Sequence, residues 1–295
     1  MRGRWGLLHN PRSAKTIPSI IKWTGSKRSQ ASSISSLIPS YRRYIEPFLG
    51  GGALLYLAAT PGSVAGDLYE PLIRLWQLIQ AEPEKVIGDY EHKWKTLNEE
   101  LDSIDVSKID QSNGIPSYYY QVRKQFNQRK NPLDLNFLMR TCVNGIVRFN
   151  GNGEFNNSFH LSRRGMEPTR FRKIVHSWSL VIRDVEFVCQ DYTKTLEMAK
   201  KDDFVYLDPP YAGNQQRYIE DLDLVRFFGT LEDLNRRGVN WALSFDGRRG
   251  LKNLVHAVPP KLFKRQMMIS SGNSAVNKVL NGSVEEVEES LYLNY

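Results

Sequence analysis

Residues 41–52 of the chain read YRRYIEPFLGGG, an apolar stretch that ends in three consecutive glycines. Four further stretches are also short and apolar and end in glycine or acidic residues: SVAGDLYEP (63–71), VEFVCQDY (185–192), DFVYLDPPY (203–211) and VNWALSFDG (239–247). Such runs are typical of buried strands, and here helical patterns follow them. Alternating strands and helices predict an α/β fold with a doubly wound, mostly parallel sheet.

The expected strands end in residues that suit a binding site. In doubly wound sheets, ligands bind beyond the carboxyl ends of the strands. These ends carry Gly50, Gly51, Gly52, Asp67, Asp191, Asp208 and Tyr211. Because parallel strands end at the same edge of a sheet, we expect these residues to meet at one edge.

The spacing of the strands predicts an insertion. Between the strand ending near Asp67 and the one beginning near Val185 lie far more residues than one crossover helix needs. We therefore predict a loosely held basic leader over residues 1–20, a sheet domain formed by 21–79 and 168–295, and a smaller, mainly helical domain inserted at 80–167. Within the insert, apolar residues at helical spacing predict a solvated helix in the acidic stretch 82–110.

Charge and cysteine content narrow the function classes. The net charge of the chain is +8. Residues 116–173 hold 11 Lys and Arg against 3 Asp and Glu, so the net charge of this segment equals that of the whole chain. This concentration favours a polyanionic partner bound by the insert. Two cysteines and five scattered histidines make neither a disulfide framework nor a zinc site, and no stretch approaches a membrane span. We expect a cytoplasmic protein that needs no metal.

The tetrapeptide DPPY, Asp208 to Tyr211, is the most specific chemical signal. Two prolines stop the strand and fix an extended backbone. The Asp208 carboxylate and the Pro209 carbonyl can then accept two hydrogen bonds from an aromatic amine, while Tyr211 offers a ring for stacking. With Pro210 completing the turn, this set suits the N6 amine of adenine. The alternative is a structural turn, since aspartate before proline is common in turns.

The glycine turn and the next strand predict a nucleoside site. Gly50 and Gly52 allow close approach of backbone amides, and the stretch lacks both the GxGxxG spacing and a following GK[ST]. Asp67 can accept bonds from both hydroxyls of a ribose, although a cap or turn aspartate is the alternative. Trp23 and Lys27, just before the first strand, can enclose the methionine part of a nucleoside cofactor; the alternative is a packed tryptophan and a solvated lysine.

The insert contains the run RTCVNGIVRFNGNGEFN, residues 140–156, rich in side chains that can reach base edges. The candidate DNA-binding residues in and near this run are Arg140, Asn144, Gly145, Ile146, Arg148, Asn150 and Arg163. Loops rich in glycine and asparagine are otherwise simple turns. Their clustering in the basic segment favours recognition.

Five motifs together, in the same order, resemble the Dam-type DNA adenine-N6 methyltransferase family: KWTGSK (22–27), EPFLGGG (46–52), GDLYEP (66–71), the run at 140–156 and LDPPY (207–211). The resemblance extends from about Ile21 to SLYLNY at the end, which looks like the family's last strand. It implies a Rossmann-like methyltransferase fold and S-adenosylmethionine as cofactor. It also implies duplex DNA as partner and a prokaryotic or phage origin, with action at the nucleoid.

The resemblance also implies roles for residues. The catalytic residues would be Asp208, Pro209, Pro210 and Tyr211. The cofactor-binding residues would be Trp23, Lys27, Pro47, Phe48, Gly50, Gly52, Asp67, Asp191, Tyr192 and Asp208. The run at 140–156 would be a target-recognition hairpin. The protein would act in restriction-modification, with a cognate endonuclease as a further partner. It would work as a monomer or a weak dimer. Val143 stands where relatives often have an aromatic residue, so GATC is one candidate target only.

The expected reaction is transfer of a methyl group to the N6 amine of an adenine flipped out of the duplex. Cytosine-N4 or RNA adenine methylation would use a related pocket, and Asp208 in place of a serine, together with the large insert, favours adenine in DNA. A noncatalytic DNA-binding protein of the same fold is the other alternative.

Overall fold

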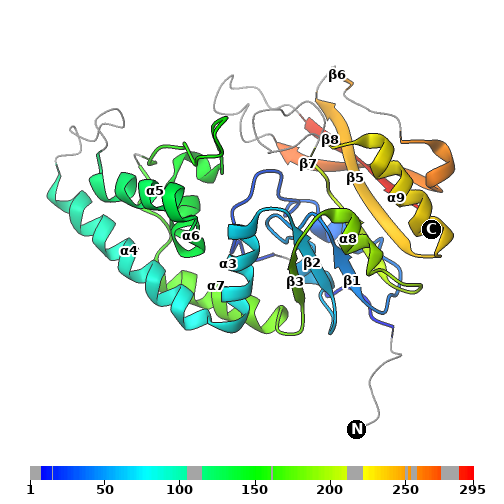
Figure 1. The fold of residues 1–295 in the computed structure, drawn as a ribbon, viewed down its shortest axis with the longest axis horizontal. Helices are drawn as coiled ribbons and strands as arrows, with labels where there is room; N and C mark the ends of the chain where they lie inside the picture. The colour runs from blue at the N-terminus through cyan, green and yellow to red at the C-terminus, as the bar shows by residue number, and fades with distance from the viewer. Residues whose placement is uncertain are drawn as a thin grey trace, which may run out of the picture.

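The structure, a computed structural model, describes residues 8–14, 16–104, 115–160, 162–210, 222–249, 252–253, 258–273 and 286–295. Its centre is one sheet in the order β3-β2-β1-β4-β5-β8-β7, with β6 beside β5. The strands are β1 (Tyr44–Glu46), β2 (Val64–Asp67), β3 (Glu186–Cys189), β4 (Phe204–Leu207), β5 (Asn240–Arg249), β6 (Lys252–Asn253), β7 (Arg265–Asn273) and β8 (Glu286–Leu293). Figure 1 shows this sheet on the right of the molecule.

The sheet confirms the α/β fold. All five stretches expected as strands form β1 to β5, and the neighbouring pairs among them are parallel. The SLYLNY stretch contributes the end of β8, which runs antiparallel to both β5 and β7. The strand β7 was not expected, because its sequence, RQMMISSGN, shows neither an apolar run nor regular alternation.

Helices cover both faces of the sheet. On one face lie α8 (Tyr192–Glu197) and α9 (Leu224–Arg236), and on the other lie α2 (Leu55–Ala58), α3 (Glu70–Ala81) and α7 (Pro168–Val181). The alternation of side chains along a strand explains the two cores. In β4, Val205 and Leu207 belong to the core under α9, whereas Phe204 and Tyr206 belong to the core under α3 and α7.

The insert is helical, as expected. It contains α4 (Pro83–Ser103), α5 (Ser117–Arg129), α6 (Pro132–Thr141) and the 3₁₀ turn η2 (Val143–Gly145). Helix α4 forms within the acidic stretch and buries Val86, Tyr90 and Leu97. Every residue of α6 is buried, because α6 packs against α3, α4 and α5. The insert therefore shares its apolar core with the face of the sheet covered by α3, and Figure 1 shows it as the left-hand lobe.

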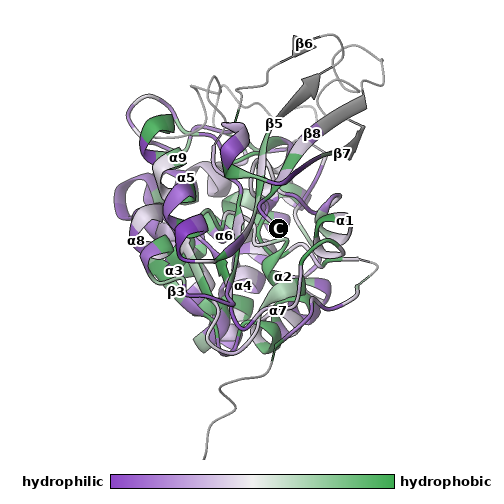
Figure 2. Ribbon diagram, turned by 90° about the vertical axis from the view of Figure 1, so that its right-hand side faces the viewer, coloured by the Kyte–Doolittle hydropathy of each residue, from purple (hydrophilic) through white to green (hydrophobic). Residues whose placement is uncertain are grey.

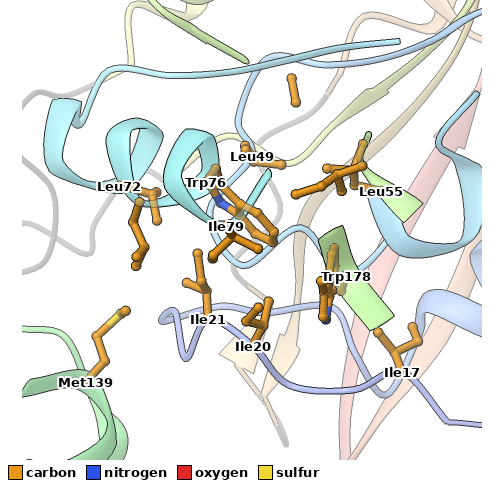
Figure 3. Close-up of a cluster of buried hydrophobic side chains, with 14 of the residues drawn as sticks. Ile17, Ile20, Ile21, Leu49, Leu55, Leu72, Trp76, Ile79, Met139 and Trp178 are labelled. Atoms are coloured by element: carbon orange, nitrogen blue, oxygen red, sulfur yellow. The ribbon is translucent and has the colours of Figure 1, made fainter. Parts of the chain in front are cut away.

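The chain before β1 joins this core. Ile17 and Ile20 are buried, and Figure 3 shows them next to Trp178 of α7. The indole Nε1 of Trp178 donates to the carbonyl of Pro18 (2.9 Å), and its ring lies 4.9 Å from that of Trp76. This packing differs from the loose leader expected from charge alone, since buried isoleucines and a satisfied indole fix residues 16–20. The short helix α1 (Ala31–Ser35) follows.

Hydropathy follows the same division between core and surface. Figure 2 shows hydrophilic residues along α5, on the outside, and hydrophobic residues in α2, near the sheet. Within the part of the chain that the structure describes, no helix is long and apolar enough to cross a membrane.

Candidate functional site

A cavity of about 560 Å³ lies at the carboxyl ends of the parallel strands. Most of the expected rim residues line it: Gly50, Gly51, Gly52, Asp67, Asp191 and Asp208. So do Trp23, Lys27, Pro47, Phe48, Tyr192, Pro209 and Pro210. Tyr211 lies outside the described residues. The strands thus bring together segments that are more than 150 residues apart in the sequence, and the volume is within the usual range for small-molecule sites.

The glycine turn is held by Asp67. The amide of Gly50 donates to Asp67 Oδ2 (3.0 Å), and the amide of Tyr69 donates to Oδ1 (3.0 Å). Burial raises the pKa of Asp67, and these amide bonds partly offset that effect because they stabilise the carboxylate. The carboxylate is therefore held in one orientation at the carboxyl end of β2.

Glycine is required in this turn. Gly50 and Gly52 have φ of +46° and +62°, a region that strains other residues. A Cβ on Gly50 would meet Trp23 Cδ1 at 2.8 Å, and one on Gly52 would meet Trp76 Cζ2 at 2.9 Å. The Trp76 indole also donates to the Gly50 carbonyl (3.2 Å). The turn is consequently a narrow backbone cradle between two indoles.

The DPPY turn begins where β4 ends, and its aspartate is paired with a lysine. Lys27 Nζ lies 2.9 Å from Asp208 Oδ1 and 3.2 Å from Glu289 Oε2. The Lys27 side chain is 5% exposed, whereas the two carboxylates are 18% and 19% exposed. A buried ammonium requires such partners, because desolvation otherwise disfavours its charge. Lys27 thus joins the loop before α1 to β4 and β8.

Glu46, at the end of β1, also lines the cavity and was not expected from the sequence. It is 3% exposed and accepts a hydrogen bond from the Tyr44 hydroxyl (3.0 Å). Burial raises the pKa of Glu46 well above its usual value; the bond from Tyr44 opposes this shift, and the charge of Asp208 adds to it. Burial therefore favours the protonated form of Glu46, which lines the same cavity as Lys27 and Asp208.

Asp191 and Tyr192 close the side of the cavity near α8. The Asp191 carboxylate caps α8 by accepting from the Thr193 amide (2.9 Å), and it pairs with Arg226 (2.9 Å). Burial would raise the pKa of Asp191, but these hydrogen bonds and the charge of Arg226 outweigh it and lower the pKa. The Tyr192 ring stacks on Phe48, with centroids 5.2 Å apart. This side presents an apolar ring pair beside a carboxylate.

An aromatic wall connects the cavity to the insert. The rings of Trp23 and Tyr69 lie 5.9 Å apart, and those of Tyr69 and Phe149 lie 5.2 Å apart. Phe149 belongs to the insert, yet it lines the cavity. Sequence reasoning missed it because it lies in a run interpreted only as a DNA-contacting segment. No sequence signal shows which side of a hairpin faces the sheet.

The run at 140–156 forms a looped hairpin. Phe149 pairs with Phe155, and the Asn150 amide donates to the Glu154 carbonyl (2.9 Å). Asn144 and Arg148 are exposed, as is Arg163 further on, whereas Gly145, Ile146 and Asn150 are partly exposed. The Arg148 Nε donates to Asn156 Oδ1 (2.9 Å), which orients its guanidinium at the surface. These candidate DNA-binding residues therefore lie on the hairpin or within a few residues of it.

Arg140 is placed differently. It is 3% exposed, its guanidinium lies 4.4 Å over the Phe171 ring, and it donates to the carbonyl of Ile20. Burial lowers the pKa of Arg140 to about 10. Since its guanidinium points into the interior at the base of the insert, we do not include Arg140 among the DNA contacts proposed below.

Comparison with known proteins agrees with this site. The model of the D12 class of N6 adenine-specific DNA methyltransferases matches residues 23–222, more than half of the chain. The chain belongs to this family. The matched range begins at Trp23 and includes the glycine turn, the insert and the DPPY turn, so it contains most of the cavity lining. Glu289 lies outside it.

Individual relatives of this D12-class methyltransferase come from archaea and bacteria. The type II methyltransferase M.MjaIII of Methanocaldococcus jannaschii is 28% identical over 255 residues, which cover 77% of this chain and 84% of that protein. A DNA adenine methylase of Haemophilus influenzae is 30% identical over 202 residues, 66% of this chain and 64% of that protein. One of Vibrio cholerae is 27% identical over 275 residues, covering 88% and 93%. Membership of the D12 class identifies the chain as an N6 adenine-specific DNA methyltransferase, as the sequence predicted.

Proposed function

We propose that this cavity binds S-adenosylmethionine and an adenine flipped out of duplex DNA, and that the protein methylates adenine N6 at specific sites. The observation that carries the proposal is the convergence of the Gly50–Gly52 turn, Asp67 and Asp208 on one cavity of about 560 Å³. A fixed carboxylate beside a glycine cradle suits a ribose, and an aspartate followed by proline suits an aromatic amine.

The residues fit the proposed cofactor. Gly50 and Gly52 leave space that a Cβ would fill, and Asp67 is held with both oxygens at the strand end, where each can accept a further bond from a ribose hydroxyl. Trp23, Phe48 and Tyr69 supply apolar surface for the adenine ring and the methionine chain of the cofactor. Asp191, Tyr192 and Pro47 would complete the binding surface. When bound, S-adenosylmethionine supplies an electrophilic methyl group.

Asp208 would orient the nucleophile. Its carboxylate and the Pro209 carbonyl would accept the two hydrogens of the amine, so that the nitrogen lone pair points at the methyl carbon. The amine must lose one proton when it is methylated, and the Asp208 carboxylate would accept that proton. Lys27, 2.9 Å from Asp208 Oδ1, would hold the carboxylate in position for this role. Pro210 fixes the turn, and Tyr211 is proposed from sequence to stack on the base.

The hairpin would read the DNA. Asn144, Ile146, Arg148 and Asn150 would contact base edges, and Arg163 a phosphate. Extruding an adenine costs about a few kcal/mol, which the contacts of the basic insert would offset. In this division residues 80–167 act as the target-recognition domain, and 21–79 with 168–295 as the methyl-transfer domain.

The proposal is tested by methyl transfer from tritiated S-adenosylmethionine to duplex DNA, with digestion of the product to nucleosides. The expected product is N6-methyl-2′-deoxyadenosine, formed at a defined subset of sites. Methylated cytosine, or no saturable binding of S-adenosylmethionine by calorimetry, would overturn the proposal.

A further inference from the structure

Three charged side chains meet at the floor of the cavity, and the proposed reaction uses only two of them. Lys27 is shared between Asp208 and Glu289, which approach its ammonium at 2.9 Å and 3.2 Å. Glu289 lies on β8, opposite Ile269 of β7 and Gly247 of β5, and its side chain lines the cavity. One ammonium therefore faces two carboxylates, which leaves the group with one excess negative charge.

This excess is more than burial of Lys27 requires. A buried ammonium is compensated by one well-placed carboxylate, and Asp208 already supplies it. A second carboxylate that is 81% covered adds a desolvation cost without a cation of its own among the described residues. Such an arrangement is stabilised when a cation enters the cavity, because a unit charge in a poorly hydrated site interacts strongly with a fixed charge.

The proposed reaction changes the charge of the bound cofactor by one. The methyl donor carries a sulfonium, whereas the product, S-adenosylhomocysteine, carries a neutral thioether in the same position. The remaining groups of the two molecules are identical. Glu289 lines the same cavity as the glycine turn and Asp67, so its fixed negative charge favours the cationic donor and weakens retention of the neutral product.

We propose that Glu289 is a specificity-determining residue that makes the cavity prefer the cationic methyl donor over its neutral product. The inference rests on the proposed function, since it places the donor in this cavity. Asp208 orients the amine and Lys27 holds Asp208, while Glu289 supplies the charge that distinguishes the two cofactor states.

The test compares three ligands by calorimetry at low ionic strength: S-adenosylmethionine, S-adenosylhomocysteine and sinefungin, in which a protonated amine replaces the sulfonium. In Glu289→Gln, we expect affinity for both cationic ligands to fall about three- to tenfold relative to the thioether. In Glu289→Asp, which keeps the charge, the ratio should stay near that of the wild type. Added salt should reduce the difference.

The matched control is Glu186→Gln. Glu186 is exposed on β3, beside Val64 at the amino end of the sheet. This substitution therefore removes the same charge far from the cavity. A structural defect in Glu289→Gln would weaken all three ligands equally and overturn the inference, as would an unchanged ratio. Wild-type protein that binds none of the three would instead overturn the proposed function, so the two failures are distinguishable.

Discussion

The Phe149 ring packs against the Tyr69 ring, with centroids 5.2 Å apart and planes inclined by 58°. The contact joins the hairpin at 140–156 to the segment that follows Asp67, whose carboxylate holds the Tyr69 amide. The hairpin proposed to read DNA is therefore in direct contact with the wall of the cavity proposed to bind the cofactor, and cofactor binding and hairpin position are expected to be coupled.

Phe149→Ala should weaken binding of S-adenosylmethionine about two- to tenfold, because an aromatic pair of this kind contributes about 0.5–1.5 kcal/mol beyond burial. Calorimetric titration without DNA measures the effect. Phe149→Tyr keeps the ring and serves as the control. Equal affinities of the alanine variant and the wild type would show that the hairpin does not shape the cavity.

Asp208→Ala should reduce methyl transfer by at least about a hundredfold, since it removes the acceptor that orients the amine. Duplex binding should remain close to that of the wild type, because the basic insert is untouched. Tritiated methyl transfer and a band-shift titration measure the two properties. A variant with near-normal turnover would show that Asp208 is not the orienting group.

Arg148→Ala should lower discrimination between target and non-target sites about tenfold, since one base contact contributes about 1–3 kcal/mol. Cofactor affinity should not change, because Arg148 is exposed on the hairpin. Sequencing of methylated sites across a random library measures the discrimination. Arg236→Ala, at an exposed position of α9, is the control and should leave the site preference intact.

Gly52→Ala should destabilise the protein by about 1–3 kcal/mol. The substitution strains a backbone with φ of +62° and places a Cβ 2.9 Å from the buried ring of Trp76. Gly229→Ala, in α9 with nothing within 4 Å, is the control and should be neutral or slightly stabilising. Urea unfolding compares the two variants. Equal stability of both would show that the cradle tolerates a side chain.

Glu46→Gln should change how stability depends on pH. Because the pKa of Glu46 is raised in the folded state, the native protein holds a proton that the unfolded chain releases above about pH 4.5, so wild-type stability falls as pH rises. The fall continues until the raised pKa is reached, at up to about 1.4 kcal/mol per pH unit. Glutamine cannot ionise, so the free energy of unfolding of the variant minus that of the wild type should increase with pH over this range. Urea unfolding at several pH values tests it, and a constant difference contradicts it.

Much of the fold was available from sequence because its signals are local. An apolar run that ends in glycine or aspartate identifies a strand and its carboxyl end, and five such runs gave β1 to β5. The edge strand β7 carries no such signal, because its sequence, RQMMISSGN, shows neither an apolar run of strand length nor regular alternation. The long interval after β2 likewise revealed the insert, but not that α6 is buried throughout and shares a core with α3.

By itself, the sequence determined β1 to β5, the insert, the family and the residues at the carboxyl ends of those five strands, because these depend on residue type and spacing along the chain. Only the tertiary structure decided which side chains meet in the cavity. Glu289 pairs with Lys27, the Phe149 ring packs against the Tyr69 ring, and Glu46 lies within the electrostatic influence of Asp208. Folding also placed Arg140 in the interior with the rest of α6, whereas Asn144 and Arg148, further along the same run, are exposed. The physical reason is that burial and charge pairing depend on distances between segments far apart in the chain, which no local pattern encodes.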